Sequence, residues 1–483
     1  MDNNGFTRLG ISQEIGKALQ NLGYETPTEV QAQVIPAVIA GKDVIVRSQT
    51  GSGKTAAFAI PVCEKIVLEQ RFPQALVLTP TRELALQVKQ DIANIGRFKK
   101  IRCAVIFGGQ PMAIQQRELK QRVHVIAGTP GRTLDHIDRE NIQLEELKYL
   151  IIDEADKMLA MGFIDQVAAI VQLLPRNRVT MLFSATLPEE IQTICKQYMR
   201  DPLRIDIESK NPAAEKIQQI YYEVQEIDKF DLMQKIIYTQ RPDSCIIFCS
   251  TREQVETLFK KTKQAGHLCG SLHGGMLQRE RLKTIQGFKR GAFHFLIATD
   301  VAARGIHVEK VSLIINYDLP LDAESYVHRI GRTGRAGNEG IAITFVTLNE
   351  RKSLADIEGV IHYQIPRQEP PSSEEAAIGK QILKNNNVLP KFKSDHSEKL
   401  NKEITKIRIN AGRKTKMRPG DILGAISNIV GVNAADIGII DVQETCSYVE
   451  ILSGQGSRVI EALSRTKIKG KVYMIKEVGF RGM

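Results

Sequence analysis

Short runs of apolar, often β-branched residues alternate with amphipathic stretches through the first three-quarters of the chain. Six such runs precede a polar segment at 208–212; they are DVIV, ALVLTP, AVIFGG, VHVIAGTP, YLIIDEAD and TMLFSAT. Each run ends in small, polar or charged residues. Apolar strands separated by helices are typical of a parallel sheet covered on both faces, whose strands end at ligand-binding loops. The pattern predicts an α/β domain over residues 1–207.

The same pattern begins again after the polar segment, with SCIIFCST, LCGSLHGG, FHFLIATD, VSLIINYD and GIAITFVT. It predicts a second α/β domain over residues 215–365. Residues 366–403 are polar, charged and contain prolines, which predicts a flexible or partly helical linker. Beyond it, strands are expected at KIRIN, IGIIDV, SYVEIL and VYMIKEV, and helices at about 419–429 and 456–464. Residues 404–483 are therefore predicted to form a small α+β domain.

Length and composition fit this organisation. A chain of 483 residues exceeds one ordinary hydrophobic core, and 42% hydrophobic with 25% charged residues is typical of a soluble globular protein. No apolar run approaches the ~20 residues that span a bilayer, and the first residues do not resemble a secretory signal. The seven cysteines include no Cys-x-x-Cys pair, so we expect reduced thiols in a cytoplasmic protein. Cys245 and Cys249 fit core packing on one face of a strand better than metal ligation.

The positive charge is concentrated at the end of the chain. The net charge is +11, and residues 404–483 hold 13 Lys and Arg against 7 Asp and Glu. About a sixth of the chain thus holds over half of the excess charge. A solvated basic surface is one interpretation. The clustering favours a polyanion partner, because Lys and Arg release condensed counterions when they neutralise phosphates. Nucleic acid is the expected partner.

A candidate phosphate-binding loop, SQTGSGKT, follows the first apolar run. It matches the pattern GxxxxGK(S/T) except that Ser48 replaces the first glycine, and it precedes AAFAIPVCEKIV, an expected amphipathic helix. Backbone amides of such a turn cradle phosphates; Lys54 would neutralise β- and γ-oxygens and Thr55 would hold Mg²⁺. Taken alone, the loop is also compatible with an ordinary glycine-rich turn. The predicted nucleotide-binding residues here are Thr50, Gly51, Ser52, Gly53, Lys54 and Thr55.

Paired carboxylates follow the apolar run YLII. Phosphoryl transfer needs one carboxylate on the metal ion and another group that orients the attacking water. Asp153 suits the first role and Glu154 the second. A solvated acidic turn is the weaker alternative, because burial of the strand would bring both acids to the crevice that holds the phosphate loop. For the base, the Gln31 amide can pair with adenine N6 and N7, and Phe6 can stack on it. The expected cofactors are ATP and Mg²⁺.

Taken together, the motifs resemble a known family. GYETPTEVQ, SQTGSGKT, PTRELA, TPGR, DEAD, SAT, ATDVAARG and HRIGRTGR occur in this order, each at a predicted strand end or loop. The set is similar to that of the DEAD-box ATP-dependent RNA helicases of superfamily two, over roughly residues 1–365. The resemblance implies two RecA-like domains that close around ATP and single-stranded RNA.

The resemblance also implies roles for individual residues. Arg332 and Arg335 would act as arginine fingers, reaching the γ-phosphate only after domain closure. Hydrolysis would be coupled to strand separation through Asp156, Ser184, Thr186 and His328. Contacts to the sugar–phosphate backbone are expected from Thr81, Arg82, Gly109, Thr129, Pro130, Gly131 and Arg132 in the first domain, and from Thr251, Arg252, Gln278, Arg281, Thr299 and Asp300 in the second.

One motif departs from the family pattern. The family has aspartate where this chain reads His307, in ARGIHV, and this aspartate resembles an acceptor for the ribose hydroxyls. Gly305 belongs to the same part of the predicted nucleotide site. Neutral histidine can accept a hydrogen bond, whereas protonated histidine cannot. We expect ATP binding to be weaker or more sensitive to pH than in a relative with aspartate.

The last domain is similar to the RNA-recognition-motif-type domain that ends helicases of the DbpA (YxiN) subfamily, on the stretches INAGRKTKMRPGDILGAI and GVNAADIGIIDVQETCSYVEIL. Domains of this fold stack bases on sheet aromatics. Here Tyr448 is available, while Cys446 and Ile451 are predicted at positions where aromatics are usual. A basic loop is the better candidate for phosphate contacts, although a solvated charged face is the alternative. Its residues are Arg413, Lys414, Lys416 and Arg418.

The subfamily resemblance implies a structured target, a hairpin in 23S rRNA, and a role in large (50S) ribosomal subunit assembly. The C-terminal domain would dock on the hairpin and the linker would present neighbouring duplex to the unselective core. We therefore predict a monomeric, cytoplasmic RNA helicase with RNA-stimulated ATPase activity and no membrane partner. One alternative is an ATP-gated RNA clamp or assembly platform with little unwinding. Another is a DNA-directed motor, which the motif set disfavours.

Overall fold

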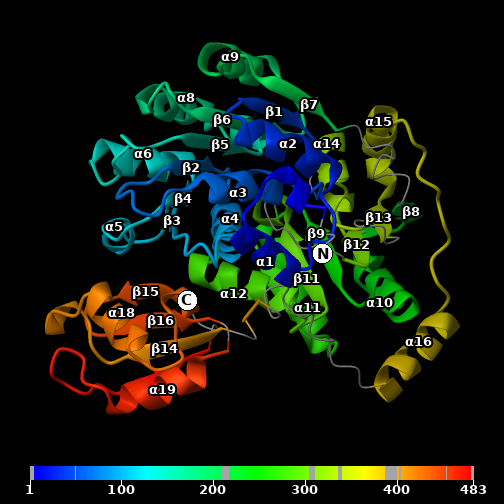
Figure 1. Ribbon diagram of the computed structural model, residues 1–483. Coiled ribbons are helices and arrows are strands. Elements are labelled where there is room, and N and C mark those ends of the chain that lie inside the picture. Colours follow the sequence, from blue (N-terminus) through cyan, green and yellow to red (C-terminus); the bar gives the residue numbers. More distant parts are fainter. Residues whose placement is uncertain are drawn as a thin grey trace. The chain divides into compact units, whose positions relative to one another are not determined.

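The structure is a computed structural model that describes residues 5–48, 51–207, 217–303, 311–334, 340–386, 400–401, 404–452 and 454–479. The chain divides into two compact units, one formed by 1–207 with 395–483 and the other by 208–394. The described residues form one seven-stranded, one six-stranded and one four-stranded sheet (Figure 1). This confirms the predicted fold class, two parallel-sheet α/β domains and a small α+β domain.

The first sheet is entirely parallel and has the order β3-β4-β2-β5-β6-β1-β7. Its strands are β1 (Val44–Arg47), β2 (Ala75–Leu78), β3 (Cys103–Ile106), β4 (Val125–Gly128), β5 (Tyr149–Asp153), β6 (Val179–Ser184) and β7 (Leu203–Asp206). Six of them correspond to the predicted runs. The seventh, β7, was not predicted; it lies at the edge beside β1, and only Ile205 is buried among its residues.

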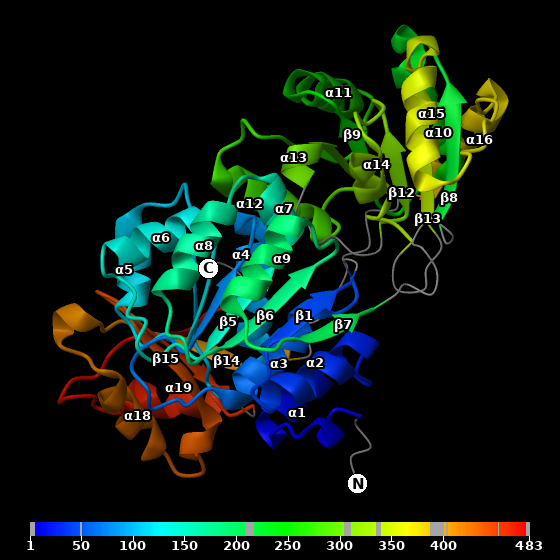
Figure 2. The same ribbon diagram turned by 90° about the horizontal axis from the view of Figure 1, so that it is seen from above.

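Helices cover both faces of this sheet, as its continuous apolar strands require (Figure 2). One face packs against α1 (Gln13–Asn21), α2 (Glu29–Ile39), α3 (Lys54–Lys65) and α4 (Arg82–Ile95). The other packs against α5 (Met112–Leu119), α6 (Pro130–Asp138), α7 (Ala155–Ala160), α8 (Ile164–Leu173) and α9 (Glu189–Tyr198). Because all strands run the same way, their carboxyl ends and the loops that follow them share one edge of the sheet.

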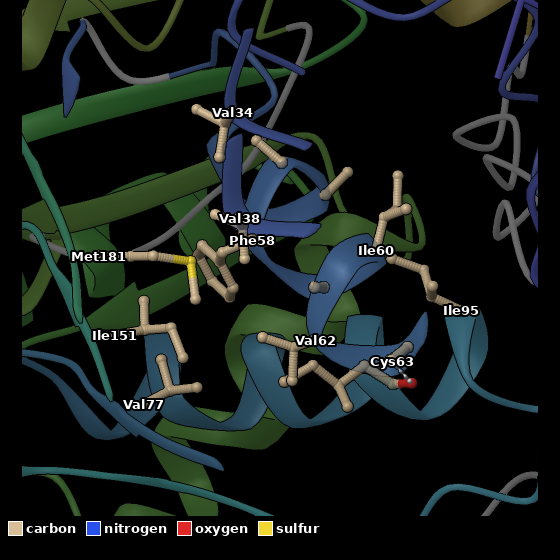
Figure 3. Packing of buried hydrophobic residues seen from close by; sticks show 14 of the residues in the cluster. Val34, Val38, Phe58, Ile60, Val62, Cys63, Val77, Ile95, Ile151 and Met181 are labelled. Atoms are coloured by element: carbon tan, nitrogen blue, oxygen red, sulfur yellow. Dashed lines mark hydrogen bonds between the residues drawn. The ribbon is translucent and has the colours of Figure 1, made fainter. Parts of the chain in front are cut away.

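The helix that follows the phosphate loop is the most deeply buried of these helices. Residues 56–63 of α3 are all buried, so this helix is apolar on every side rather than amphipathic as expected. Phe58 packs against Phe183 with ring centroids 5.4 Å apart, and Figure 3 shows Phe58 and Val62 among side chains of α2 and the sheet. Each such side chain contributes about 1.5–3 kcal/mol on burial. The packing of this core therefore fixes the position of α3 and of the phosphate loop that precedes it.

The second unit contains a parallel sheet of order β10-β11-β9-β12-β13-β8. Its strands are β8 (Ile217–Glu223), β9 (Cys245–Cys249), β10 (Cys269–Leu272), β11 (Phe295–Thr299), β12 (Leu313–Asn316) and β13 (Gly340–Val346). Its helices are α10 (Lys229–Gln240), α11 (Arg252–Gln264), α12 (Gln278–Lys289), α13 (Asp300–Ala303), α14 (Ala323–Ile330), α15 (Arg351–Ile361) and α16 (Ser373–Asn386). The edge strand β8 was not among the predicted runs.

Part of the predicted linker is a packed helix. Helix α16 lies within residues 366–403, and a Cβ added to its Gly379 would lie 2.1 Å from the carbonyl oxygen of Tyr238 in α10. Lys380 places its Nζ 5.5 Å from the centroid of the Tyr238 ring. The helical portion of the linker therefore packs closely against α10, and glycine permits this approach.

The third sheet is antiparallel, with the order β15-β16-β14-β17. Its elements are β14 (Thr405–Ile409), α18 (Pro419–Ser427), β15 (Ile437–Val442), β16 (Ser447–Ile451), α19 (Gly456–Arg465) and β17 (Ile475–Glu477), and each overlaps a predicted segment. The prediction that Ile451 stands at an aromatic position of the outer face is wrong. Side chains alternate along a strand, and Ile451 lies with Val449 in the core, opposite to Tyr448.

Cys245 and Cys249 are both buried in the core around β9, where burial raises the pKa of each thiol. Within the part of the chain that the structure describes, no helix is both long and apolar enough to cross a bilayer.

Candidate nucleotide and RNA sites

The phosphate loop connects β1 to α3, as predicted. Gly51 and Gly53 have φ of 91° and 89°, a conformation that side chains disfavour. A Cβ on Gly53 would also lie 2.6 Å from Nε2 of Gln31, so two constraints require glycine there. The structure brings Gly51, Ser52, Gly53, Lys54 and Thr55 together at this turn, while Thr50 lies outside the described residues.

Lys54 is held inside the site. Its Nζ donates a 2.8 Å hydrogen bond to the carbonyl oxygen of Ser48. Burial lowers the pKa of Lys54, and the neighbouring Asp153 and Glu154 carboxylates oppose that shift. Ser48 also accepts a 3.2 Å hydrogen bond from the Ser52 hydroxyl, so the residue that replaces the usual glycine stabilises the loop through its side chain.

The predicted carboxylate pair lies at the carboxyl end of β5. Asp153 is buried, burial raises its pKa to about 6, and its Oδ1 has no hydrogen-bond partner among the described residues. Glu154 adopts φ 55°, ψ 52°, a left-handed conformation that is rare for a residue with a side chain and characteristic of functional sites. Its Oε1 lies 2.6 Å from Nζ of Lys157. A lysine and two carboxylates thus converge beside a phosphate-type turn, an arrangement suited to polyphosphate chemistry.

Three of the four residues predicted to couple hydrolysis to RNA form a connected group, and the fourth, His328, lies in α14 of the second unit. The backbone N–H of Asp156 donates to the Ser184 hydroxyl over 3.1 Å. In return, one carboxylate oxygen of Asp156 accepts from the backbone N–H groups of Ala185 and Thr186 over 3.0 and 3.1 Å. Ser184 also accepts from the N–H of Ser48 through its carbonyl oxygen, at 3.0 Å. The phosphate loop, the acidic motif and the SAT loop are therefore joined by hydrogen bonds.

The two residues predicted to bind adenine are both buried. The Gln31 amide oxygen accepts from the Thr28 N–H over 3.0 Å, and its nitrogen donates to the Gly53 carbonyl over 3.2 Å. Gln31 therefore links the start of α2 to the phosphate loop. Phe6 is fully buried and meets Tyr24 edge to face at 6.2 Å between centroids.

In the first domain, the predicted RNA residues gather at the carboxyl ends of β2, β3 and β4. Thr81 caps α4 by accepting from the N–H of Leu84, and it places Arg82 in the first turn of that helix. Gly109 has φ 85°, and a Cβ there would lie 2.5 Å from Nη1 of Arg82. The third stretch forms the start of α6. It contains Thr129, Pro130, Gly131 and Arg132.

The second unit repeats part of this arrangement. Thr251 caps α11, and a Cβ on Gly275 would lie 2.3 Å from Nη1 of Arg252. The remaining predicted contacts in this unit lie at the start of α12 and at the β11–α13 junction. They are Gln278, Arg281, Thr299 and Asp300.

One buried residue of the second unit was missed. Arg329 donates to both carboxylate oxygens of Asp300 at 2.6 Å, and its Nη1 donates to the Asp318 carbonyl at 2.7 Å. HRIGRTGR contains three arginines, and only the last two were assigned a role. Of those, Arg332 is buried and its Nε donates to the carbonyl oxygen of His328 over 3.2 Å. Arg335 lies outside the described residues, as do Gly305 and His307.

In the C-terminal domain, the predicted phosphate-binding loop is exposed. Buried Met417 anchors it, while Arg413, Lys414, Lys416 and Arg418 are exposed to solvent. Tyr448 lies on the outer face of β16 with Nζ of Lys406 5.5 Å from its ring centroid. Cationic groups that surround an aromatic ring on a sheet can bind a nucleic-acid base and its phosphate.

Comparison with known families finds three matches along the chain. The DEAD/DEAH box helicase family matches residues 28–194, the helicase conserved C-terminal domain matches 228–337, and the DbpA RNA binding domain matches 406–477.

Similar proteins extend the match over almost the whole chain. This chain is 51% identical to the ATP-dependent RNA helicase DbpA of Bacillus subtilis, over 96% of this chain and 98% of that protein. It is 39% identical to the ATP-dependent RNA helicase DbpA of Escherichia coli, over 95% and 96%. Among solved structures, Saccharomyces cerevisiae Dbp5 bound to RNA and ADP BeF3 is 33% identical with a TM-score of 0.69, over 79% of this chain and 100% of that one.

Proposed function

The chain belongs to the DEAD-box ATP-dependent RNA helicases, which hydrolyse ATP, and we propose that its C-terminal domain selects the RNA on which this activity is used. The proposed target is a hairpin of 23S rRNA, and the proposed role is assembly of the large (50S) ribosomal subunit in the cytoplasm. In this proposal the protein acts as a monomer.

The single observation that carries the proposal is the match of residues 406–477 to the DbpA RNA binding domain. The exposed basic loop before α18 and the excess of Lys and Arg after residue 404 support it, because phosphate contacts need exposed cations. The predicted RNA residues of the helicase domains sit on glycine loops and helix starts, which suit backbone contacts that do not depend on base identity. Selectivity is therefore assigned to the C-terminal domain.

At the proposed ATP site, Lys54 exchanges the Ser48 carbonyl for phosphate oxygens, and Gln31 recognises the adenine edge. The buried Oδ1 of Asp153, which has no hydrogen-bond partner among the described residues, and the Thr55 hydroxyl fit a hard cation such as Mg²⁺. When bound, Mg²⁺ supplies positive charge that neutralises the phosphates. Glu154 orients the attacking water, and Arg332 and Arg335 stabilise the negative charge of the transition state.

Coupling is assigned to the connected group of Asp156, Ser184 and Thr186, together with His328 of the second unit. When a phosphate displaces the Ser48 carbonyl from Lys54, the resulting movement of Ser48 would be transmitted to the SAT loop (residues 184–186) through the Ser48–Ser184 hydrogen bond. In the proposed cycle, ATP and RNA close the two helicase domains, one RNA strand is clamped, and hydrolysis releases it.

The test is steady-state ATPase activity of the full chain with large-subunit rRNA, unrelated RNA and single-stranded DNA. The comparison is a variant with Gln at Arg413, Lys414, Lys416 and Arg418. We expect stimulation at low concentrations of large-subunit rRNA, and loss of this selectivity in the variant. Equal stimulation by both RNAs in both proteins would contradict the proposed target. ATPase activity without release of a short RNA duplex would instead indicate an ATP-gated clamp, and stimulation by DNA would indicate a DNA motor.

A further inference from the structure

Helix α5 contains a buried glutamine where burial of an apolar residue is the rule. Gln115 is fully buried and is the one buried residue of this helix, while its neighbour Ile114 is 47% exposed. Glutamine is seldom fully buried, and isoleucine is among the residues most often found inside proteins. Hydrophobic packing therefore does not explain this pair, and the hydrogen bonds of Gln115 must account for its position.

Every hydrogen-bonding position of the Gln115 amide is used. Its Nε2 donates to the carbonyl oxygen of Phe107 at 2.8 Å and to Oε1 of Gln110 at 2.9 Å. Its Oε1 lies 3.0 Å from Nε2 of His136 and accepts from Nη1 of Arg132 at 3.3 Å. An amide offers two donors and, at its oxygen, two lone pairs, so this buried group is fully satisfied.

The surrounding groups fix the orientation of the amide. The Phe107 carbonyl only accepts and the Arg132 guanidinium only donates, so the nitrogen must face Phe107 and the oxygen must face Arg132. His136 is fully buried, and burial, assisted by the Arg132 charge, lowers its pKa to about 4. The imidazole is therefore neutral at pH 7, and its Nε2–H donates to Gln115.

These bonds connect two of the stretches predicted to contact RNA. Phe107 and Gln110 flank the Gly108–Gly109 turn after β3, whereas Arg132 and His136 belong to α6 after β4. Arg132 closes the connection by donating from Nη1 to the Gln110 carbonyl at 2.9 Å. Through Gly109, which lies against Arg82, the same turn also abuts the start of α4, the remaining predicted RNA stretch of this domain.

We propose that Gln115 is a positioning residue for RNA binding, which holds the Gly108–Gly109 turn and the start of α6 at the separation that one RNA backbone requires. The inference rests on the proposed RNA contacts of these loops. Hydrogen bonds to phosphates need donors fixed to within a fraction of an ångström, and loops lack a regular element that fixes them. Gln115 supplies the missing link from a buried position, without touching RNA itself.

The test compares full-length Gln115→Met, which keeps length and volume but removes all four hydrogen bonds, with Gln115→Glu, which keeps only the acceptors. The matched control is Gln116→Met on the same helix, because Gln116 is partly exposed and its side chain bonds only to Asn141 among the described residues. ATPase activity is titrated with single-stranded poly(U), and the midpoint of thermal unfolding is measured for each protein.

We expect the half-stimulating RNA concentration to rise about tenfold in Gln115→Met, equivalent to ~1.4 kcal/mol, and less in Gln115→Glu. The rate at saturating RNA should change far less, and Gln116→Met should match the parent protein. A lowered unfolding midpoint with an unchanged half-stimulating concentration in both Gln115 variants would overturn the proposal, since Gln115 would then be structural only.

A further variant tests the proposed RNA contacts of these loops independently of the role of Gln115. Arg82→Ala should raise the half-stimulating RNA concentration whether or not Gln115 acts as proposed. If Arg82→Ala has the effect and the Gln115 variants do not, only the positioning role fails. If neither has an effect while RNA still stimulates the parent protein, the assignment of these loops to RNA fails as well.

Discussion

The Oδ2 atom of Asp156 accepts hydrogen bonds from the backbone N–H of Thr186 at 3.1 Å and of Ala185 at 3.0 Å. The last acidic residue of the DEAD motif is thus joined to the SAT loop by charge-assisted bonds, which are about twice as strong as neutral ones. Asp156→Asn keeps the shape and removes the charge. We expect the number of ATP molecules hydrolysed per short RNA duplex released to rise about tenfold, because hydrolysis continues while its coupling weakens.

Parallel assays of ATP hydrolysis and duplex release check this ratio. Asp165→Asn, a change of the same kind at an exposed residue of α8, serves as the control. If hydrolysis and duplex release fall by the same factor in Asp156→Asn, Asp156 contributes to the chemical step and not to coupling.

Glu154 should be needed for hydrolysis and not for ATP binding. Glu154→Gln keeps a group that can hold water but removes the base, and general bases contribute about 10²- to 10⁴-fold to rates. We expect kcat to fall within this range while the Kd of a fluorescent ATP analogue changes less than about threefold. Glu190→Gln, at an exposed residue of α9, is the control. Weakened nucleotide binding with an unchanged kcat would contradict the assigned role.

Most strands that are buried on both faces could be predicted from the sequence. The central strands of both parallel sheets are continuous apolar runs and were predicted. The edge strand β7 has exposed Leu203 beside charged residues, and β8 contains Gln218 and Gln219, so neither forms such a run. The edge strands β3 and β10 were among the predicted runs, whereas β7 and β8 are defined by the neighbour that each pairs with, a tertiary fact that is absent from the local pattern.

The candidate sites likewise contain residues that could be predicted from the sequence and residues that could not. Lys54 and Asp153 were predicted because each belongs to a recognisable motif, in which Lys54 begins the helix after β1 and Asp153 ends β5. Arg329 and Gln115 were not, because their roles come from partners far along the chain, Asp300 and His136 among them. From the sequence alone, a glutamine between Ile114 and Gln116 is expected to be exposed to solvent. Only the loops that pack around it explain its burial.

Acid should destabilise the fold through two buried histidines of the first domain. Burial lowers the pKa of both His124 and His136 to about 4, against about 6.5 in an unfolded chain. Between pH 6.5 and 4 the unfolded chain therefore holds more protons, and the free energy of unfolding decreases as pH falls. The contribution is at most ~1.4 kcal/mol per pH unit for each imidazole.

Guanidinium unfolding, followed by far-UV circular dichroism at pH 5 and 7, tests this expectation. In His136→Gln the side chain does not titrate, so the variant should lose less stability between the two pH values than the parent protein. Equal losses in both proteins would show that His136 is protonated in the folded state at pH 5.

ATP binding should be pH-sensitive because of His307. This residue lies outside the described part of the chain, so the prediction rests on the sequence motif ARGIHV. A histidine ring that gains a proton as the pH falls from 8 to 6 no longer accepts a hydrogen bond from a ribose hydroxyl. We expect the KM for ATP to rise over this interval in the parent protein and to stay level in His307→Asp. An identical KM in both proteins at every pH would contradict the assignment.

RNA binding by the C-terminal domain should depend on salt through the basic loop. Lys414 and Lys416 are exposed, and each phosphate neutralised adds about 0.7–0.9 to the slope of log affinity against log salt concentration. Lys414→Gln/Lys416→Gln should therefore flatten the slope by about 1.5, measured by fluorescence anisotropy with a labelled 23S rRNA hairpin in 50–200 mM KCl. Lys260→Gln/Lys263→Gln on α11 removes the same charge from another exposed site, and its slope should change less. Weaker binding with an unchanged slope in the loop variant would mean that the two lysines shape the loop and do not contact phosphates.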